Sequence, residues 1–82
     1  MNELAQKVPP VALAGLRRYV EERVPTGGFL RAVLENNLSE SFGRADETNS
    51  AALFDIVTYC YWEIPGNCWG SPAKVAAWLE GG

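Results

Sequence analysis

The 82-residue sequence contains no histidine, and this absence excludes several kinds of chemistry at once. Histidine is the commonest general base near neutral pH and the commonest metal ligand. Cysteine–histidine and serine–histidine–aspartate catalysis therefore cannot be assembled within this chain. Asp46 and Asp55 remain as carboxylate candidates, but both are expected on one helix with no third metal ligand. The sequence predicts a protein that is not an enzyme and that uses no cofactor or metal.

Basic residues and cysteines are also few. Seven lysines and arginines stand against ten carboxylates, for a net charge of −3, so general attraction to nucleic-acid phosphates is disfavoured. The first predicted helix carries Arg17 and Arg18, but Glu21 and Glu22 one turn away offset this pair. Cys60 and Cys68 belong to no cysteine-dense framework, and we expect buried thiols, with a disulfide as the alternative.

No continuous apolar run is long enough for a membrane span or a secretion signal. Together with the low cysteine content, this predicts a protein of a reducing cytoplasm. Residues 1–8 are predicted to be a short leader, and residues 9–80 a single domain. Because 48% of the residues are apolar, the chain can build a core without metal or disulfide. Some apolar surface is expected to remain, which favours a homo-oligomer.

The most apolar stretch runs from Asn49 to Ile64 and contains only three firmly polar residues after Ala51. A helix that is apolar nearly all round is usually surrounded by other helices. No alternating strand pattern occurs anywhere. The sequence therefore predicts an all-α fold: a small bundle of four to five helices around a central apolar helix over about residues 47–63.

Capping residues and prolines predict where the other helices begin and end. A first helix should begin at Pro10 and stop at Pro25, because proline fits a first turn and breaks a helix interior. Side-chain caps are expected for three later helices, which begin near Phe29, near residue 47 and at Pro72; the caps are Thr26, Asp46 and Ser71. A further short helix is expected over residues 39–44. The second helix should end at Asn36, since asparagine tolerates the left-handed conformation.

One candidate site is predicted where Gly27 and Gly28 open the second helix. Free backbone N–H groups at a helix start favour anions, and Arg31 lies one turn further on. Arg44 and Trp69 are second choices, as a further phosphate ligand and as a stacking surface for a base. Two simpler interpretations remain open: a glycine pair also suits a sharp turn between helices, and Trp69 also suits the end of the core.

Two further features of the apolar stretch bear on function. Asp55 is expected to form a structural ion pair or hydrogen bond with Arg44, Arg31 or Tyr59, because a carboxylate on so apolar a helix needs a partner or water; a ligand contact is the alternative. Tyr61 and Trp62 are adjacent on a helix and so point about 100° apart. One of these two rings is therefore expected to face a partner, a ligand or the Trp69 loop.

In combination these segments resemble a widespread group of small phage- and prophage-encoded proteins, mostly of unknown function. The resemblance covers about residues 10–80 and rests on Pro25–Leu30, Ala32–Leu34, Asn36, Arg44–Asp46, Asn49, Tyr59–Pro65, Trp69–Pro72 and Trp78. Where Asn-Asp-Leu is usual in the group, this chain has Asn36-Asn37-Leu38. The resemblance implies a phage protein that acts in the cytoplasm of the bacterial host, against host defence.

Two functions are therefore expected. The first is sequestration of an anionic, nucleotide-derived small molecule at Gly27, Gly28 and Arg31, with Arg44 and Trp69 contributing. The second is a protein-binding inhibitor or adaptor that engages a host defence protein through an exposed apolar and aromatic surface. The first requires a concave, arginine-lined cavity and the second a flat aromatic surface.

Overall fold

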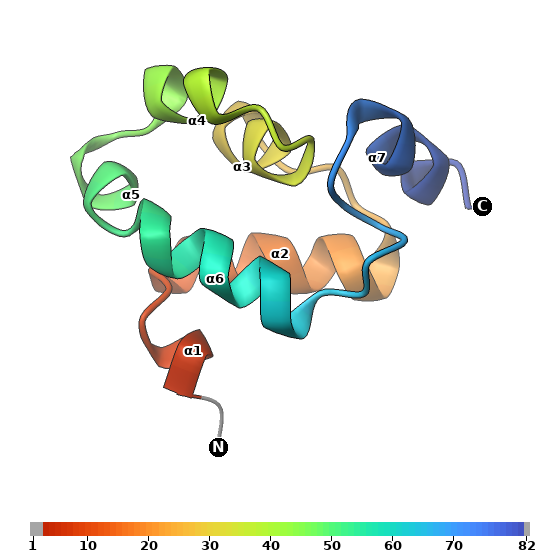
Figure 1. Cartoon of the computed structure of the whole chain (residues 1–82). Coiled ribbons are helices and arrows are strands. Elements are labelled where there is room, and N and C mark those ends of the chain that lie inside the picture. Colours follow the sequence, from red (N-terminus) through yellow and green to blue (C-terminus); the bar gives the residue numbers. More distant parts are fainter. Residues whose placement is uncertain (1–2, 82) are drawn as a thin grey trace.

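The computed structural model describes residues 3–81, which form helices joined by short loops (Figure 1). The helices are α1 (Glu3–Gln6), α2 (Pro10–Glu22), α3 (Gly28–Leu34), α4 (Leu38–Arg44), α5 (Glu47–Ala51), α6 (Leu53–Glu63) and α7 (Pro72–Leu79). No strand occurs in this range, so the predicted all-α fold and small helical bundle are confirmed. Residues 3–81 contain seven helices rather than the four to five predicted, because α1 was not expected and the long helix is divided.

Local capping sets most of the helix boundaries as predicted. The Asp46 carboxylate accepts a hydrogen bond from the N–H of Asn49 at 2.8 Å, and the Ser71 hydroxyl accepts one from Lys74 at 3.1 Å. Asn36 has φ +63° just after α3. The prediction of Thr26 as a cap is wrong: Gly27 occupies the cap position of α3, and the Thr26 hydroxyl donates to the Gly27 carbonyl instead.

The first long helix ends earlier than its proline suggested. α2 stops at Glu22, and Arg23 follows in the left-handed conformation with φ +57°. The Arg23 N–H donates to the carbonyls of Arg18 and Tyr19, and the helix therefore ends before it reaches Pro25. The turn is therefore completed by an arginine, in a conformation that costs a non-glycine residue about 1 kcal/mol or more.

The helix predicted over residues 47–63 is interrupted at Ala52, between α5 and α6. α5 contains no buried residue, so no buried side chain of its own holds it in line with α6. α6 in contrast buries Leu53, Ile56, Tyr59 and Cys60. The division thus follows burial, because neither proline nor glycine lies near Ala52.

The molecule is flat, and this explains why α6 is not enclosed. Its Cα atoms extend over 32 × 31 × 17 Å. Two helix layers span about 15 Å between their outermost Cα atoms, so the short dimension holds two layers and no third. Every helix in such an arrangement has an outward side. The expectation that the long apolar helix is surrounded on all sides is therefore wrong.

One continuous core joins the layers. Leu16 of α2, Leu34 of α3, Ile56 of α6 and Val75 of α7 are fully buried in it. Ala5 and Val8 join the same core, so part of the segment predicted as a leader packs against the domain. Met1 and Asn2, the first two residues of that leader, lie outside the described residues.

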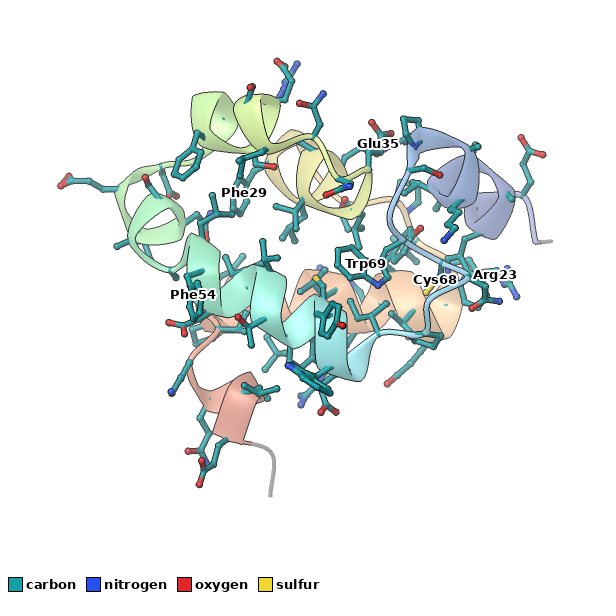
Figure 2. All side chains as sticks on the ribbon, in the orientation of Figure 1. Arg23, Phe29, Glu35, Phe54, Cys68 and Trp69 are labelled. Carbon is teal, nitrogen blue, oxygen red and sulfur yellow. The ribbon has the colours of Figure 1, made fainter. Side chains whose placement is uncertain are left out.

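Four residues fasten the C-terminal segment to the end of α2, and we call them the C-terminal clasp: Tyr19, Arg23, Cys68 and Trp78. The buried Tyr19 hydroxyl donates to the Cys68 carbonyl at 2.6 Å, and the Trp78 indole N–H donates to the Tyr19 carbonyl at 2.8 Å. Arg23 donates to the Trp78 carbonyl at 2.8 Å and stacks on the indole at 3.7 Å. Figure 2 shows Arg23 and Cys68 together beside α7.

Both cysteines are free and buried, so the expected thiols are found and the alternative disulfide is absent. Burial raises the pKa of Cys60 to about 12, and burial likewise raises the pKa of Cys68. The Cys68 thiol donates to the Pro65 carbonyl at 3.2 Å. These thiols are protonated core groups at neutral pH and are poor nucleophiles.

Replacing Tyr19 with phenylalanine should destabilise the fold at neutral pH. The change leaves the buried Cys68 carbonyl without its donor, which costs about 1–2 kcal/mol in the free energy of unfolding. Burial raises the pKa of Tyr19 from 10.0 to about 12, so wild type loses stability as the pH rises from 10 toward 12. Urea unfolding between pH 7 and pH 12 should show the gap between wild type and Tyr19→Phe narrowing over that window.

Tyr61→Phe is the matched control, because it removes a tyrosine hydroxyl on the exposed side of α6. It should change the free energy of unfolding by less than about 0.5 kcal/mol at any pH. Equal effects of the two substitutions at pH 7 would contradict the assigned role of the Tyr19 hydrogen bond.

Candidate functional site

Three of the predicted site residues meet in one small pocket. Gly28, Arg31 and Arg44 line a cavity of about 260 Å³ between α3 and α4. The Arg44 guanidinium lies over Gly28: a Cβ atom built on this glycine would be 3.0 Å from Arg44 Nη1. A larger residue at position 28 would thus displace Arg44. We call this cavity the α3–α4 pocket.

Each arginine in the α3–α4 pocket already pairs with a glutamate. Arg31 contacts Glu35 at 2.8 Å, and Arg44 contacts Glu40 at 3.3 Å. Both glutamates also line the cavity. An anion entering here would meet two carboxylates as well as two guanidinium groups, so the net attraction is small. The pocket is concave and arginine-lined, but its charge is balanced.

Trp69 lies apart from these residues. Its side chain is half-buried and packs against the core (Figure 2). It lines neither the α3–α4 pocket nor the larger pocket beside Gly27. The adjacent Gly70, with φ +116°, donates its N–H to the Leu34 carbonyl at 2.7 Å and ties the loop to the end of α3. The structure therefore does not place Trp69 where a base could stack beside Arg31 or Arg44.

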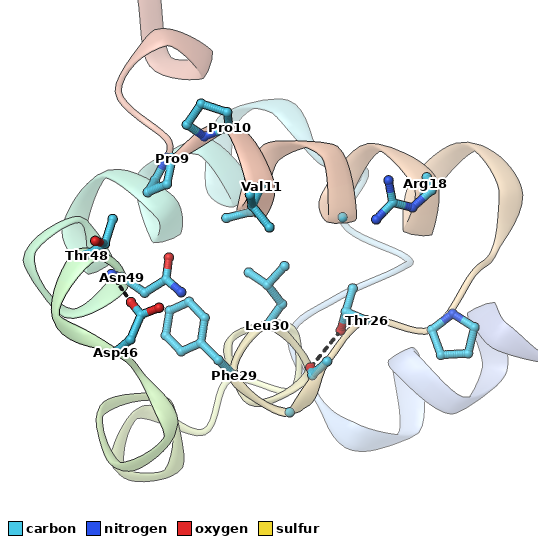
Figure 3. A pocket seen from close by; sticks show the side chains of 15 residues that line it. Pro9, Pro10, Val11, Arg18, Thr26, Phe29, Leu30, Asp46, Thr48 and Asn49 are labelled. Carbon is cyan, nitrogen blue, oxygen red and sulfur yellow. Dashed lines mark hydrogen bonds between the residues drawn. The ribbon is translucent and has the colours of Figure 1, made fainter.

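Gly27 opens onto a second, larger pocket, which we call the α2–α3 pocket (Figure 3). It measures about 610 Å³, and Gly28 lines it as well, so this residue stands between the two cavities. No side chain caps the start of α3 beside it. The wall contributed by α2 includes Val11, Gly15 and Arg18.

Arg18 was missed as a pocket residue, although the sequence contains a signal for it. Val11, Gly15 and Arg18 are spaced four and three residues apart, which places them on one face of a helix. The glycine leaves a gap between the other two. Such a gap predicts a hollow on the helix surface, flanked by an apolar and a cationic side chain.

The outward side of α6 carries a second candidate surface. We call it the aromatic face, and it consists of Phe54, Val57, Tyr61 and Trp62. Phe54 is 81% exposed, Tyr61 67% and Trp62 68%. Tyr61 and Trp62 meet edge to face with ring centroids 5.0 Å apart. One of these two rings was expected to face outward, and in the structure both rings do.

Polar groups on α6 do little to interrupt the aromatic face. The Thr58 hydroxyl donates to the Phe54 carbonyl at 2.7 Å, which satisfies it within the helix. The Asp55 carboxylate makes no hydrogen bond or ion pair with any residue in 3–81, so the predicted pairing with Arg44, Arg31 or Tyr59 is wrong. The side chain is only partly covered, and water can solvate the carboxylate.

The described part of the chain contains neither a cluster of metal-ligating side chains nor a helix that could span a membrane. Among residues 3–81, no three of the acidic or cysteine side chains gather closely enough to hold a metal ion. In the same range, every helix is too short or too polar to cross a bilayer. Comparisons with protein-family models, curated proteins and solved structures find no match. The resemblance to phage-encoded proteins accordingly stays a prediction.

Removing the Arg31 charge should leave the fold almost unchanged. Arg31→Gln breaks one partly exposed ion pair within a helix, and such pairs contribute about 0.3–0.5 kcal/mol. We therefore expect a loss of no more than about 0.5 kcal/mol in chemical unfolding at low salt, and less at 1 M salt. A loss above about 2 kcal/mol would mean that Arg31 is a structural residue rather than an available ligand.

Proposed function

We propose that this protein is a non-enzymatic binding protein that engages another protein through the aromatic face of α6. The observation that carries the proposal is the exposure of three large rings on one side of a helix whose other side is in the core. Tryptophan and tyrosine are the side chains most enriched at the energetic centres of protein interfaces.

The area of the aromatic face is adequate for such a role. A large aromatic side chain offers about 150–250 Å², so three rings at these exposures present roughly 300–500 Å² of apolar surface. The largest apolar patch on a typical monomer has a similar size and is often functional. With a polar rim, each partner contributes about 800 Å² to a standard interface. The aromatic face would form the centre of that area.

The fixed position of α6 also favours binding at the aromatic face. Ile56 and Cys60 on the inner side of α6 are fully buried, which fixes the helix that carries the rings. The Tyr61–Trp62 contact restrains two of the rings before any partner arrives. A surface that is ordered in advance loses little conformational entropy on binding, so more of the contact energy contributes to affinity.

The paired arginines weigh against the other expected function, capture of a nucleotide-type anion at Arg31 and Arg44. Both guanidinium groups already donate to a glutamate through Nε, and an anion bound between them would lie beside both carboxylates. The resemblance to phage-encoded proteins, in turn, favours a host defence protein as the partner. A second copy of this chain is the other occupant that the aromatic face suits, which would make the protein a homo-oligomer.

Charge placed on the aromatic face should abolish binding without unfolding the protein. We expect the double variant Phe54→Glu/Tyr61→Glu to keep its helical signal and melting temperature, because both side chains are already exposed. Sedimentation should show whether wild type self-associates. Photo-crosslinking from position 57, which lies on the aromatic face and is unchanged in the double variant, should show in a bacterial lysate which protein it contacts.

Phe42→Glu is the control for that experiment. Phe42 is 54% exposed on α4 and does not belong to the aromatic face, so its replacement should preserve both self-association and crosslinking. The proposal fails if wild type is a monomer that crosslinks to nothing. It also fails if the double variant binds as wild type does.

A further inference from the structure

The α2–α3 pocket has the size and lining of a small-molecule site. Its volume of about 610 Å³ lies within the range of about 300–1,000 Å³ typical of ligand sites. Its apolar lining includes Val11, Phe29 and Leu30. Val11 is 86% exposed, the highest value of any large apolar residue in the described chain. An apolar ligand body lying in the pocket would cover it.

Two glycines that line the pocket shape it in opposite ways. At Gly15, α2 and α3 approach so closely that a Cβ atom would be 3.1 Å from Leu30 Cδ1. At Gly27 the opposite holds, since a Cβ atom there would meet nothing within 4 Å. A side chain at position 27 would therefore extend into open space at the wall of the pocket.

Charge is separated along the pocket. Arg18 lies at one end, and Figure 3 shows its guanidinium turned toward the space above Leu30. Asp46 and Asn49 lie at the opposite end, where the Asp46 carboxylate caps α5. Arg18 forms no ion pair with any residue in 3–81, in contrast to the two paired arginines of the α3–α4 pocket.

The dimensions limit the ligand. Val11 and Arg18 are seven residues apart on one helix, which corresponds to roughly 10 Å along its axis. A ligand that spans them needs an apolar body of about that length. The unpaired guanidinium at one end suits an anionic group, because arginine presents paired donors to a carboxylate. The Asp46 carboxylate at the other end repels an anion and so sets the orientation.

We propose that the α2–α3 pocket binds a small organic acid, with its apolar body between Val11 and Leu30 and its carboxylate on Arg18. This site shares no residue with the aromatic face, so the proposal does not depend on the proposed function.

The test is a titration of the ¹⁵N-labelled protein with three probes that share an eight-carbon chain: octanoate, octanol and octylamine. Octanoate should give saturable amide shifts at Gly15, Gly27 and Gly28. Octanol should bind about tenfold more weakly, since it lacks the charge-assisted bond to Arg18, and octylamine more weakly still. Equal affinities for the three probes would overturn the assignment of the carboxylate to Arg18. Shifts confined to α6 would place the probes on the aromatic face and overturn the site.

Two matched pairs of variants complete the test. Arg18→Gln should reduce octanoate affinity about tenfold, whereas Arg17→Gln, on the neighbouring exposed arginine outside the pocket, should not. Gly27→Leu should fill the pocket and abolish octanoate binding. Its φ of −70° suits any residue, so the variant should fold, which its amide spectrum will show.

Gly43→Leu is the control for added volume, because a Cβ atom there also meets nothing within 4 Å and Gly43 lines neither pocket. It should bind octanoate as wild type does. Wild-type affinity in Gly27→Leu would overturn the proposal, and so would equal losses in Arg17→Gln and Arg18→Gln.

Discussion

The C-terminal clasp is the constraint on which the rest of the structure depends. Its hydrogen bonds join residues 49 to 59 positions apart, and they fasten the last quarter of the chain to the end of α2. This attachment brings Val75 into the core and lets the loop at Gly70 bond to the end of α3. With α3 held from that side, its first turn faces α2 across a fixed distance, and the α2–α3 pocket lies between them.

Features that depend on neighbouring residues were predictable from the sequence. Asp46 and Ser71 cap helices, and Asn36 ends one, because each needs only the backbone within three or four residues. The environment of α6 was not predictable in this way. A helix that is apolar on every side gives no periodic signal for which side is buried. That choice is made by the two-layer shape, which is a property of the whole chain.

The candidate site was predicted in part, for the same physical reason. Gly27 and Gly28 do border open space, as their lack of side chains indicates. The pairing of Arg31 with Glu35 and of Arg44 with Glu40 follows the spacing of four residues that favours ion pairs on a helix, so it was legible in the sequence. The spacing of Val11, Gly15 and Arg18 indicates a hollow on α2, but the pocket beside Arg18 also required the tertiary approach of α3 to Gly15, which no local pattern contains.

The left-handed backbone conformation at Arg23 affects how the protein unfolds. One residue both terminates α2 and supplies the guanidinium that grips α7. If α7 detaches, the strained conformation at this position loses the bonds that offset its cost, and the last turn of α2 should fray with it. α2 and α7 are thereby thermodynamically coupled, so we expect the domain to unfold as one cooperative unit rather than with α7 detaching first.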